Sequence, residues 1–500
     1  MPQLKLSEKF RWYPVYEDTT RFGSAVTNRC DASVRNACAD IVAYRQARGL
    51  SSVVAHTREL LNAAMSDGLV EFYERPGILH RDWLYPHPPS VQPAALAVED
   101  EMGQAIARIP LSAELLPDLA GYLGEWSQGA APPSQPSALN LWNALIDLGA
   151  FAEAVPPIAP FPGNATFVGH STVCIQSAAA RIWVDPFLLP KSSQYPKTYQ
   201  PLGLSELGQP DAVFITHSHP DHYDLASLLR LGADTPIYVP DVRRESVLAI
   251  DMAFRLRQLG FRQVRTLAWY EEATVKDLRA IALPFYGEQP TVFHALHPEV
   301  RNAGNTYLFE WGDRRIALAA DSGQDGQGNI KALAAEALQR YGVLDVLFGG
   351  FRGFALYPIQ YLFSSVARYL TFVPPSLWSV RQQMMCDADD LLDVGEIWQT
   401  QTIIPYSDGG APWYWLRGLG PALDGSSPAI LAVDPTPAHL VEVAARRSGT
   451  IQDGAIASPV LLEFLYPGDS LAWTQNGMDV LRPQCWPYGT QPSHQTRANP

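Results

Sequence analysis

The sequence predicts an α/β fold in which two β-sheets pack face to face with helices outside, preceded by a mostly helical N-terminal domain. Three observations support this prediction. Apolar residues recur at helical spacing through much of residues 1–155, Pro-rich segments then interrupt the chain at 127–138 and 155–162, and strand patterns alternate with helix patterns from residue 165 onward. Strands that alternate with helices form sheets whose outer faces are covered by helices.

The same evidence divides the chain into three parts. Residues 1–155 form the N-terminal domain, residues 156–450 the two-sheet domain, and residues 451–500 a C-terminal extension. In the extension, residues 460–466 and 470–474 are expected to pair as a hairpin. Helices are expected in the N-terminal domain at 32–49, 51–67, 94–108, 112–126 and 139–154.

The two-sheet domain opens with a β-rich segment at 165–176, which continues as a hairpin through 181–184. Further strands are expected at 213–215, 237–239, 264–268, 306–310, 316–320, 343–348 and 402–404. Helices are expected at 225–231, 243–259, 329–341 and 437–446. Because the alternation of strand and helix occurs twice over, we expect two sheets.

The composition restricts the class of protein. The 500 residues are 47% hydrophobic and carry a formal net charge of -14, which argues against nucleic-acid binding because that requires a basic face. The chain has no apolar run of about 18 residues, and its N-terminus lacks the pattern of a signal peptide. The five cysteines show no Cys-x-x-Cys spacing and fit a reducing compartment. We therefore expect a cytoplasmic location and no membrane contact.

The strongest functional signal is the segment Thr216-His217-Ser218-His219-Pro220-Asp221-His222, which directly follows an apolar strand pattern. Imidazole nitrogen and carboxylate oxygen both bind divalent first-row metals, and four such ligands in six residues are more than one ion requires. The spacing therefore predicts two metal ions. We expect His217 and His219 to face one ion, and Asp221 and His222 to face the second.

Residues 163–450 resemble the metallo-β-lactamase superfamily, whose αββα sandwich holds two metals at one edge of its sheets. The resemblance rests on the motif at 216–222, on Gly169-His170-Ser171-Thr172, and on Ala319-Ala320-Asp321-Ser322-Gly323 at a strand end. It implies that Asp321 bridges the two metals, because one shared carboxylate offsets their repulsion. It also implies that His170 is a supporting residue and not a ligand.

Two ligand positions depart from the hydrolases of this superfamily. The third His of the first metal is replaced by Glu288 within Phe285-Tyr286-Gly287-Glu288. The final His, which usually follows a strand like Ile403-Ile404-Pro405, is also missing, and Asp408 is a candidate for its place. With both carboxylates as ligands the site would be rich in oxygen, which favours iron or manganese over zinc.

Glu288 and the Ala-Ala-Asp-Ser segment around Asp321 resemble the diiron β-hydroxylase branch of the superfamily, known from chloramphenicol biosynthesis. The resemblance implies two Fe ions, with Mn/Fe or two Zn ions as alternatives, and places Glu288 and Asp321 at the catalytic centre. It further implies an amino-acid substrate, free or tethered to a carrier protein, and an N-terminal domain that forms a homodimer. Because the sequence shows no reductase or flavin motif, an external electron donor is expected.

Several alternatives remain open at this point. His294 and His297 could supply the missing third His instead of Glu288, and Arg352 and Arg381 could hold a substrate carboxylate or phosphate. The aromatic-rich segment at 348–380 could cover the metals or form ordinary core. The favoured function is an oxygenase that hydroxylates or N-oxygenates an amino-acid-like substrate of a biosynthetic pathway. The alternatives are a dizinc hydrolase of an ester, lactone or phosphodiester, and a non-catalytic scaffold.

Overall fold

The computed structural model describes most of the two-sheet domain and part of the N-terminal region. The described residues are 4–16, 92–153, 163–191, 200–289, 302–356, 377–407, 437–449 and 461–482, together with positions 55 and 59 and apart from positions 244, 246–248, 354, 378–379, 384 and 476. The helices expected at 32–49 and 51–67 lie outside the described residues. Most of the aromatic-rich segment at 348–380 also lies outside the described residues.

The first sheet has eight strands in the order β11-β10-β9-β8-β7-β6-β23-β24. Strands β8 to β11 run parallel to one another, whereas β6, β7 and the C-terminal pair are antiparallel to their neighbours. The bounds are β6 (Ala165–Gly169), β7 (Thr172–Gln176), β8 (Arg181–Val184), β9 (Ala212–Phe214), β10 (Ile237–Pro240), β11 (Val264–Leu267), β23 (Ser470–Thr474) and β24 (Gly477–Leu481).

The second sheet has seven strands in the order β12-β13-β14-β15-β18-β21-β22. An antiparallel meander from β12 to β15 is followed by parallel pairing of β15, β18, β21 and β22. The bounds are β12 (Glu272–Val275), β13 (Leu278–Pro284), β14 (Asn305–Trp311), β15 (Arg314–Leu318), β18 (Val346–Gly349), β21 (Thr402–Pro405) and β22 (Leu461–Leu462).

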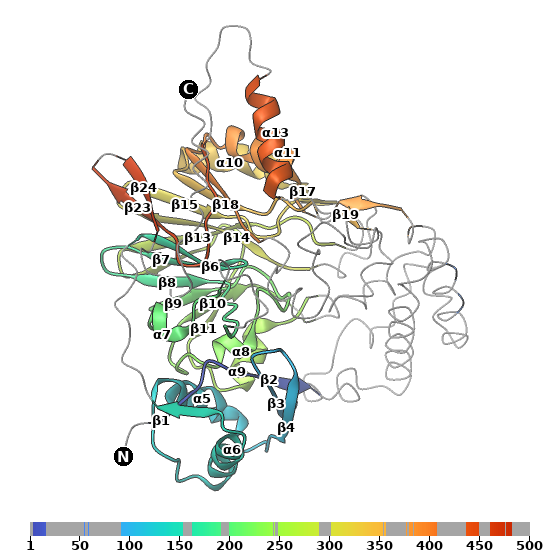
Figure 1. Cartoon of the computed structure of the whole chain (residues 1–500). Coiled ribbons are helices and arrows are strands. Elements are labelled where there is room, and N and C mark those ends of the chain that lie inside the picture. The colour runs from blue at the N-terminus through green and yellow to red at the C-terminus, as the bar shows by residue number, and fades with distance from the viewer. Residues whose placement is uncertain are drawn as a thin grey trace.

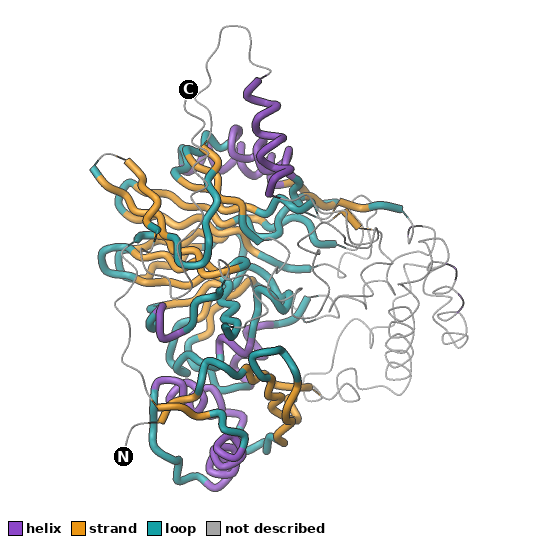
Figure 2. Tube along the Cα trace, in the orientation of Figure 1, coloured by secondary structure: helices purple, strands orange, loops and turns teal. Residues whose placement is uncertain are grey.

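Three apolar layers hold the sheets and helices together. Between the sheets, Phe214 of β9 stacks on Tyr238 of β10 and meets Phe309 of β14 edge to face. The outer face of the second sheet packs against α10 (Ile330–Tyr341), α11 (Ala388–Ile397) and α13 (Pro437–Gly449). The outer face of the first sheet packs against α8 (Leu225–Leu228) and α9 (Met252–Gln258), with α7 (Leu204–Leu207) beside them. Figures 1 and 2 show this sandwich of two strand layers between helices.

Local sequence signals account for the helix ends. The Asp251 side chain accepts a hydrogen bond from the backbone nitrogen of Phe254, so α9 begins after this cap and not at residue 243 as expected. Asn329 caps α10 in the same way, and Asp387 forms a capping box with Asp390 at the start of α11.

The described part of residues 1–155 contains both strands and helices, so the mostly helical N-terminal domain is not confirmed. The helix expected at 94–108 is wrong: this segment forms β3 (Pro93–Glu99) and β4 (Ala105–Pro110), which pair with β2 (Arg11–Tyr16). The apolar run Ala94-Ala95-Leu96-Ala97-Val98 packs inside the three-stranded sheet, and the turn at Asp100–Gly103 closes the hairpin. Tertiary pairing here overrides an alanine-rich helical propensity.

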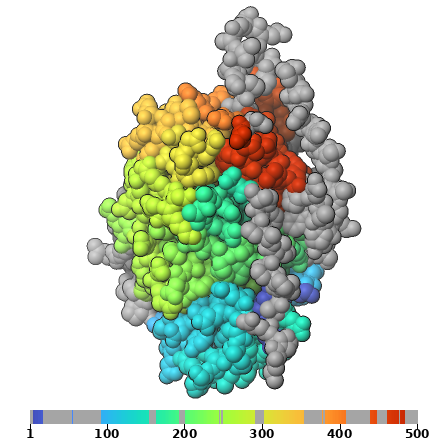
Figure 3. All heavy atoms as spheres, turned by 90° about the vertical axis from the view of Figure 1, so that its left-hand side faces the viewer, coloured from blue at the N-terminus to red at the C-terminus, as the bar shows by residue number. Residues whose placement is uncertain are grey.

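The helices expected at 112–126 and 139–154 are present with shifted bounds. They are α5 (Leu119–Gln128), which follows the short 3-10 helix η2 (Leu116–Asp118), and α6 (Pro136–Asp147). After α6 the chain forms β5 (Phe151–Glu153), which pairs with β1 (Leu4–Leu6). This region packs on the first sheet through α5, η2 and β2, and Figure 3 shows it as the blue and cyan lower body in contact with the green half of the sandwich.

The C-terminal strands are divided between the two sheets. Leu461–Leu462 extends the second sheet beside β21, while Ser470–Thr474 pairs with β6 and β24 in the first sheet. The hairpin expected between 460–466 and 470–474 is therefore wrong, because the two segments enter different sheets. The hairpin that does form pairs β23 with β24.

Four two-residue strands, which form two antiparallel pairs, complete the described secondary structure. Strands β16 (Gln324–Asp325) and β17 (Gly328–Asn329) form a hairpin after β15, and β19 (Ala355–Leu356) pairs with β20 (Gln382–Gln383). Among the residues that the structure describes, no helix is both long and apolar enough to cross a bilayer.

Candidate metal centre

The predicted ligands meet where strands of both sheets end. The motif at 216–222 follows β9, Asp321 follows β15, and Glu288 follows β13. The backbone nitrogen of Asn305 donates to Thr216 O at 2.7 Å, which joins the end of β9 to the start of β14 in the opposite sheet. Carboxyl ends of parallel strands lie on one sheet edge, so the loops that follow them converge there.

The first group of ligand atoms consists of His217, His219 and Glu288. Glu288 Oε2 lies 2.8 Å from His217 Nε2 and 2.5 Å from His219 Nδ1. His217 is fully buried, yet its Nε2 has no partner with hydrogen-bond geometry among the described residues. Donor atoms that are close together without forming a hydrogen bond are typical of ligands aimed at one ion.

The second group contains His222, Asp321 and again His217, with all ligand atoms within 4.8 Å of one another. His222 Nε2 lies 3.1 Å from Asp321 Oδ2. Asp321 is therefore close to a ligand of each expected ion, which is the position that a bridging carboxylate requires. Its other oxygen, Oδ1, accepts a hydrogen bond from Ser407 Oγ.

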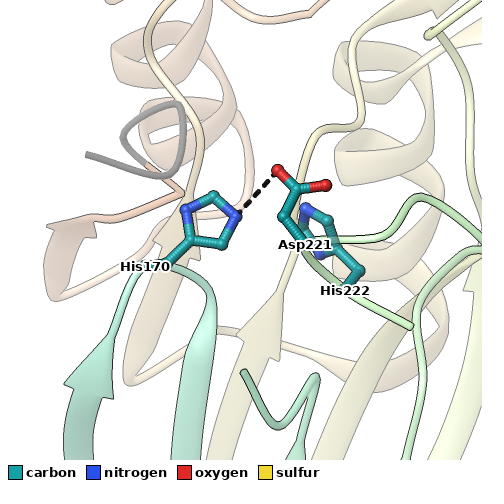
Figure 4. A group of neighbouring side chains, drawn as sticks. All are labelled: His170, Asp221 and His222. Atoms are coloured by element: carbon teal, nitrogen blue, oxygen red, sulfur yellow. Dashed lines mark ion pairs between the residues drawn. The ribbon is translucent and has the colours of Figure 1, made fainter. Parts of the chain in front are cut away.

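The third group consists of His170, Asp221 and His222 (Figure 4). His170 stands in the turn between β6 and β7, and its ring points toward Asp221, with Nε2 at 3.1 Å from Asp221 Oδ2. The rings of His170 and His222 meet edge to face with centroids 5.2 Å apart. Three overlapping groups thus form one continuous cluster of metal-binding side chains.

Hydrogen bonds behind the cluster fix which histidine nitrogens face it. Asp185, at the end of β8, accepts from His222 Nδ1 at 2.8 Å and from Thr216 Oγ1 at 2.5 Å. Since Thr216 Oγ1 uses its single hydrogen on Asp185, it accepts from His217 Nδ1 at 3.0 Å. Both Nδ1 atoms therefore carry the proton, which leaves the Nε2 lone pairs of His217 and His222 for a metal.

The backbone at the cluster is strained. Of the eight described non-glycine residues with positive φ, five lie at the site: His170 (49°), Asp185 (44°), Glu288 (50°), Ala320 (48°) and Ser407 (55°). Left-handed backbone in such residues is costly and persists where the surrounding structure enforces it, commonly at functional sites. This concentration supports a functional role for the sheet edge.

Electrostatics within the cluster favour charged carboxylates. Burial alone would raise the pKa of the Glu288 carboxyl, but His219 and His217 hold it well below its ordinary value. Burial lowers the pKa of His217. Burial also opposes protonation of His222, yet the Asp321 and Asp185 carboxylates raise its pKa well above 6.5. The cluster thus contains anionic oxygen beside imidazoles, the donor set that a cation would neutralise.

The donor set fits two metal ions. Ligand atoms bound at 2.0–2.2 Å and at right angles around one ion are about 2.8–3.1 Å apart. The distances of 2.8 Å for His217–Glu288, 3.1 Å for His222–Asp321 and 3.1 Å for His170–Asp221 fall in this interval, and the 2.5 Å for His219–Glu288 lies below it. His217, His219 and Glu288 would hold the first ion, Asp221 and His222 the second, and Asp321 would lie between them.

Six of the seven predicted ligands are therefore brought together: His217, His219, Asp221, His222, Glu288 and Asp321. Their individual roles stay predictions. Asp408, His294 and His297 lie outside the described residues. Arg352 follows β18 and Arg381 precedes β20, and neither belongs to the three groups of ligand atoms.

Sequence reasoning assigned no role to Asp185, Ser171 or Ser407. Ser171 Oγ donates to Ser407 Oγ at 2.8 Å, which in turn donates to Asp321. Asp185 is fully buried and directly follows a strand of the same sheet as the His motif. Both this position and the likeness of Val184-Asp185-Pro186 to the opening hairpin of the superfamily were signals that could have singled it out.

Comparisons with known proteins agree with this geometry. Residues 180–353 match the family model of the β-lactamase superfamily domain. The chain is 29% identical over 174 residues to the 4-amino-L-phenylalanyl-[CmlP-peptidyl-carrier-protein] 3-hydroxylase of Streptomyces venezuelae, a match that covers 33% of this chain and 31% of the relative. It is 31% identical over 118 residues to the N-acyl-phosphatidylethanolamine-hydrolyzing phospholipase D of Saccharomyces cerevisiae, covering 22% of this chain and 23% of the relative.

The fold can be compared over a longer stretch. The structure of CmlA, a diiron beta-hydroxylase from Streptomyces venezuelae, superposes with a TM-score of 0.59 and 16% sequence identity, covering 96% of this chain and 99% of CmlA. The sequence matches, in contrast, span about a third or less of the curated relatives. The chain therefore has the metallo-β-lactamase fold, and its residues 180–353 are similar to the β-lactamase superfamily domain, as its motifs predicted.

Proposed function

We propose that this chain is a dinuclear iron oxygenase that hydroxylates an amino-acid-like substrate. The observation that carries the proposal is the position of Glu288. Its Oε2 lies 2.8 Å from His217 Nε2 and 2.5 Å from His219 Nδ1, where the hydrolases of this fold place an imidazole. A carboxylate at that position makes the first metal site richer in hard oxygen donors, which favour iron or manganese.

The residues of this chain would act by orienting donors and by excluding water. Two bound Fe(II) ions supply the reduction of O2, which requires electrons from an external donor. Asp185 holds the two Nδ1 protons in place, either directly or through Thr216, so that both lone pairs face the metals. His217 and His222 are fully buried, whereas the side chains of His219 and Asp221 retain 13% and 21% exposure. Access for O2 and substrate would lie beside these two residues.

The substrate class comes from the related hydroxylase, whose name gives an aminoacyl group on a peptidyl carrier protein as its substrate. We propose the same class here, an amino acid that is tethered to a carrier protein or free. A role for the N-terminal region in homodimer formation, and a cytoplasmic location, belong to the same proposal.

Metal analysis and oxygen consumption together test this function. Protein purified from iron-supplemented cells should contain about two irons per chain. After anaerobic reduction, it should consume O2 faster in the presence of aminoacylated carrier protein than in the presence of the empty carrier. The matched variant E288A should lose both the second equivalent of metal and the substrate-dependent O2 consumption.

A dizinc hydrolase is the second candidate, and the partial match to the yeast phospholipase is the observation that favours it. In that case zinc-bound water, made acidic by the metal, would attack an ester, lactone or phosphodiester. Zinc in the purified protein, esterase or phosphodiesterase activity, and no substrate-dependent O2 consumption would replace the first proposal with the second.

A further inference from the structure

The second metal position lacks an imidazole at the strand end where the superfamily usually provides one. Ser407, at the end of β21, uses its Oγ to donate to Asp321 Oδ1 and to accept from Ser171 Oγ at 2.8 Å. The preceding Tyr406 hydroxyl accepts from the backbone nitrogen of Ala320 at 2.9 Å. Neither residue offers a strong donor to a metal, and Asp408, the candidate for this place, lies outside the described residues. Of the assigned ligands that the structure describes, Asp221, His222 and Asp321 belong to this position.

His170 fills the space next to this strand end. The backbone nitrogen of Ser407 donates to His170 O at 3.1 Å, so the turn between β6 and β7 lies directly against the end of β21. From there the His170 ring points toward Asp221, with Nε2 at 3.1 Å from Asp221 Oδ2 (Figure 4).

The geometry of His170 is fixed. Its side chain is 2% exposed and packs edge to face on His222 and on Phe187, with ring centroids 5.2 and 5.8 Å away. Its backbone is held at φ 49° beside Gly169, whose φ of 145° suits only glycine. One ligand atom from each of His170, Asp221 and His222 lies within 4.8 Å of the others.

We propose that His170 Nε2 is a metal ligand that completes the second position, together with Asp221, His222 and the shared Asp321. The imidazole that is missing after β21 is thereby supplied from the β6–β7 turn. This inference rests on the dinuclear site of the proposed function, and it holds for iron, manganese or zinc.

The competing role of His170 is that of a supporting residue which donates an Nε2 hydrogen to a metal-bound Asp221. The two roles require opposite properties of the side chain. A ligand needs a lone pair, which a carboxylate supplies, whereas a donor needs an N–H, which an amide supplies. H170E and H170Q are nearly identical in size and carry the same backbone strain at φ 49°, so they separate the two roles.

We expect H170E to bind about two ions per chain and H170Q to bind about one, with affinity for the second ion reduced more than the roughly 10–100-fold that loss of an outer partner causes. Titration of the metal-free protein with Fe(II) or Zn(II), followed by elemental analysis, measures this. H439Q, which removes an exposed imidazole on α13, should bind two ions. Thermal unfolding of each metal-free variant controls for folding.

The inference is overturned if H170Q keeps two ions while H170E loses one, or if both variants bind two ions with wild-type affinity. If both lose an ion, anomalous diffraction from the metal-loaded wild-type protein decides. An Nε2–metal distance of about 2.1 Å supports ligation, and a distance beyond about 3 Å overturns it. Failure of the proposed oxygenase function would be seen separately, in the metal identity and O2 consumption of the wild-type chain.

Discussion

Asp185 accepts a hydrogen bond from His222 Nδ1 at 2.8 Å, and through Thr216 it also controls His217. One buried carboxylate therefore orients a ligand from each group of the metal cluster. Partners of this kind fix the tautomer and raise the basicity of the ligand. The φ of 44° at Asp185 shows that the end of β8 is shaped to place this side chain.

We predict that D185N lowers metal affinity by about 10–100-fold. Asparagine tolerates the left-handed backbone, but it has one acceptor oxygen where Asp185 uses two, Oδ1 for the backbone nitrogen of Thr216 and Oδ2 for His222 Nδ1. Competition against a chromophoric chelator measures the change. D211N is the matched control, because Asp211 lies just before β9 and pairs with the half-exposed Lys276 between β12 and β13. The metal affinity of D211N should be unchanged. Equal affinities for both variants would show that Asp185 does not orient the ligands.

We predict that E288A loses one of two metal ions, whereas H294A and H297A retain both. Glu288 Oε2 lies close to ring nitrogens of His217 and His219, so its removal leaves the first ion with only those two imidazoles and the shared Asp321. Elemental analysis after dialysis measures the stoichiometry. Two ions in E288A and one ion in either histidine variant would reassign the third ligand of the first metal.

Restoring the imidazole should change the metal preference. In E288H the first position would become rich in nitrogen, and we expect the zinc-to-iron ratio of protein from cells supplied with both metals to rise at least several-fold. Inductively coupled plasma mass spectrometry of wild type and E288H, purified side by side, gives the ratio. An unchanged ratio would mean that Glu288 does not set metal identity.

Stability and metal affinity should depend on pH with opposite signs. Burial opposes protonation of His219 and His222, but Glu288 raises the pKa of His219, and Asp321 and Asp185 raise that of His222. Because the pKa values of both histidines are higher in the folded than in the unfolded chain, their protonation stabilises the metal-free fold. This stabilisation is complete below about pH 6.5 and is lost as the pH rises through the pKa values of the folded state. Metal must displace the same protons, so its apparent affinity should rise about tenfold per pH unit for each proton released.

Urea unfolding of the metal-free protein from pH 6.5 upward, and metal titrations over the same range, measure the two trends. Metal titrations in two buffers of different ionisation enthalpy count the protons released. If metal affinity were independent of pH and no protons were released, these histidines would not be protonated in the metal-free chain.

Most of the sandwich could be predicted from the sequence because its strands are short apolar runs that are bounded by turn residues and separated by amphipathic helices. The metal motif was also predictable from a local pattern, because its four potential ligands lie within six consecutive residues. The segment at 94–108 was not predictable, because its alternation of alanine with larger apolar residues fits a helix as well as a strand. Only pairing with β2, about 80 residues away, decides between them.

The rest of the site depends on contacts between distant segments. Asp185 and His222 are 37 positions apart, and Ser407 and Asp321 are 86 apart. Neither Asp185-Pro186 nor Tyr406-Ser407 has a local pattern that marks a metal site. The Glu288 substitution could be noticed only because the superfamily resemblance had fixed where an imidazole was expected.

The packing of α5 against the two-sheet domain gives a prediction about how the N-terminal region is attached. A Cβ at Gly124 would lie 2.2 Å from Leu231 O and 2.9 Å from Gly232 Cα, both of them backbone atoms after α8. At Gly121, one turn earlier on the same helix, the nearest atom is Ala233 Cβ at 3.9 Å, an ordinary contact. The first site requires glycine, and the second does not.

We therefore predict that G124A lowers the free energy of unfolding by about 1–3 kcal/mol, because α5 must move away from the backbone of Leu231 and Gly232. G121A should raise it by up to about 1 kcal/mol, since alanine favours helix. Urea unfolding measures both. Limited proteolysis of G124A should cut near residues 129–135, between α5 and α6, sooner than in G121A. Equal stability of the two variants would show that α5 does not pack closely on the segment after α8.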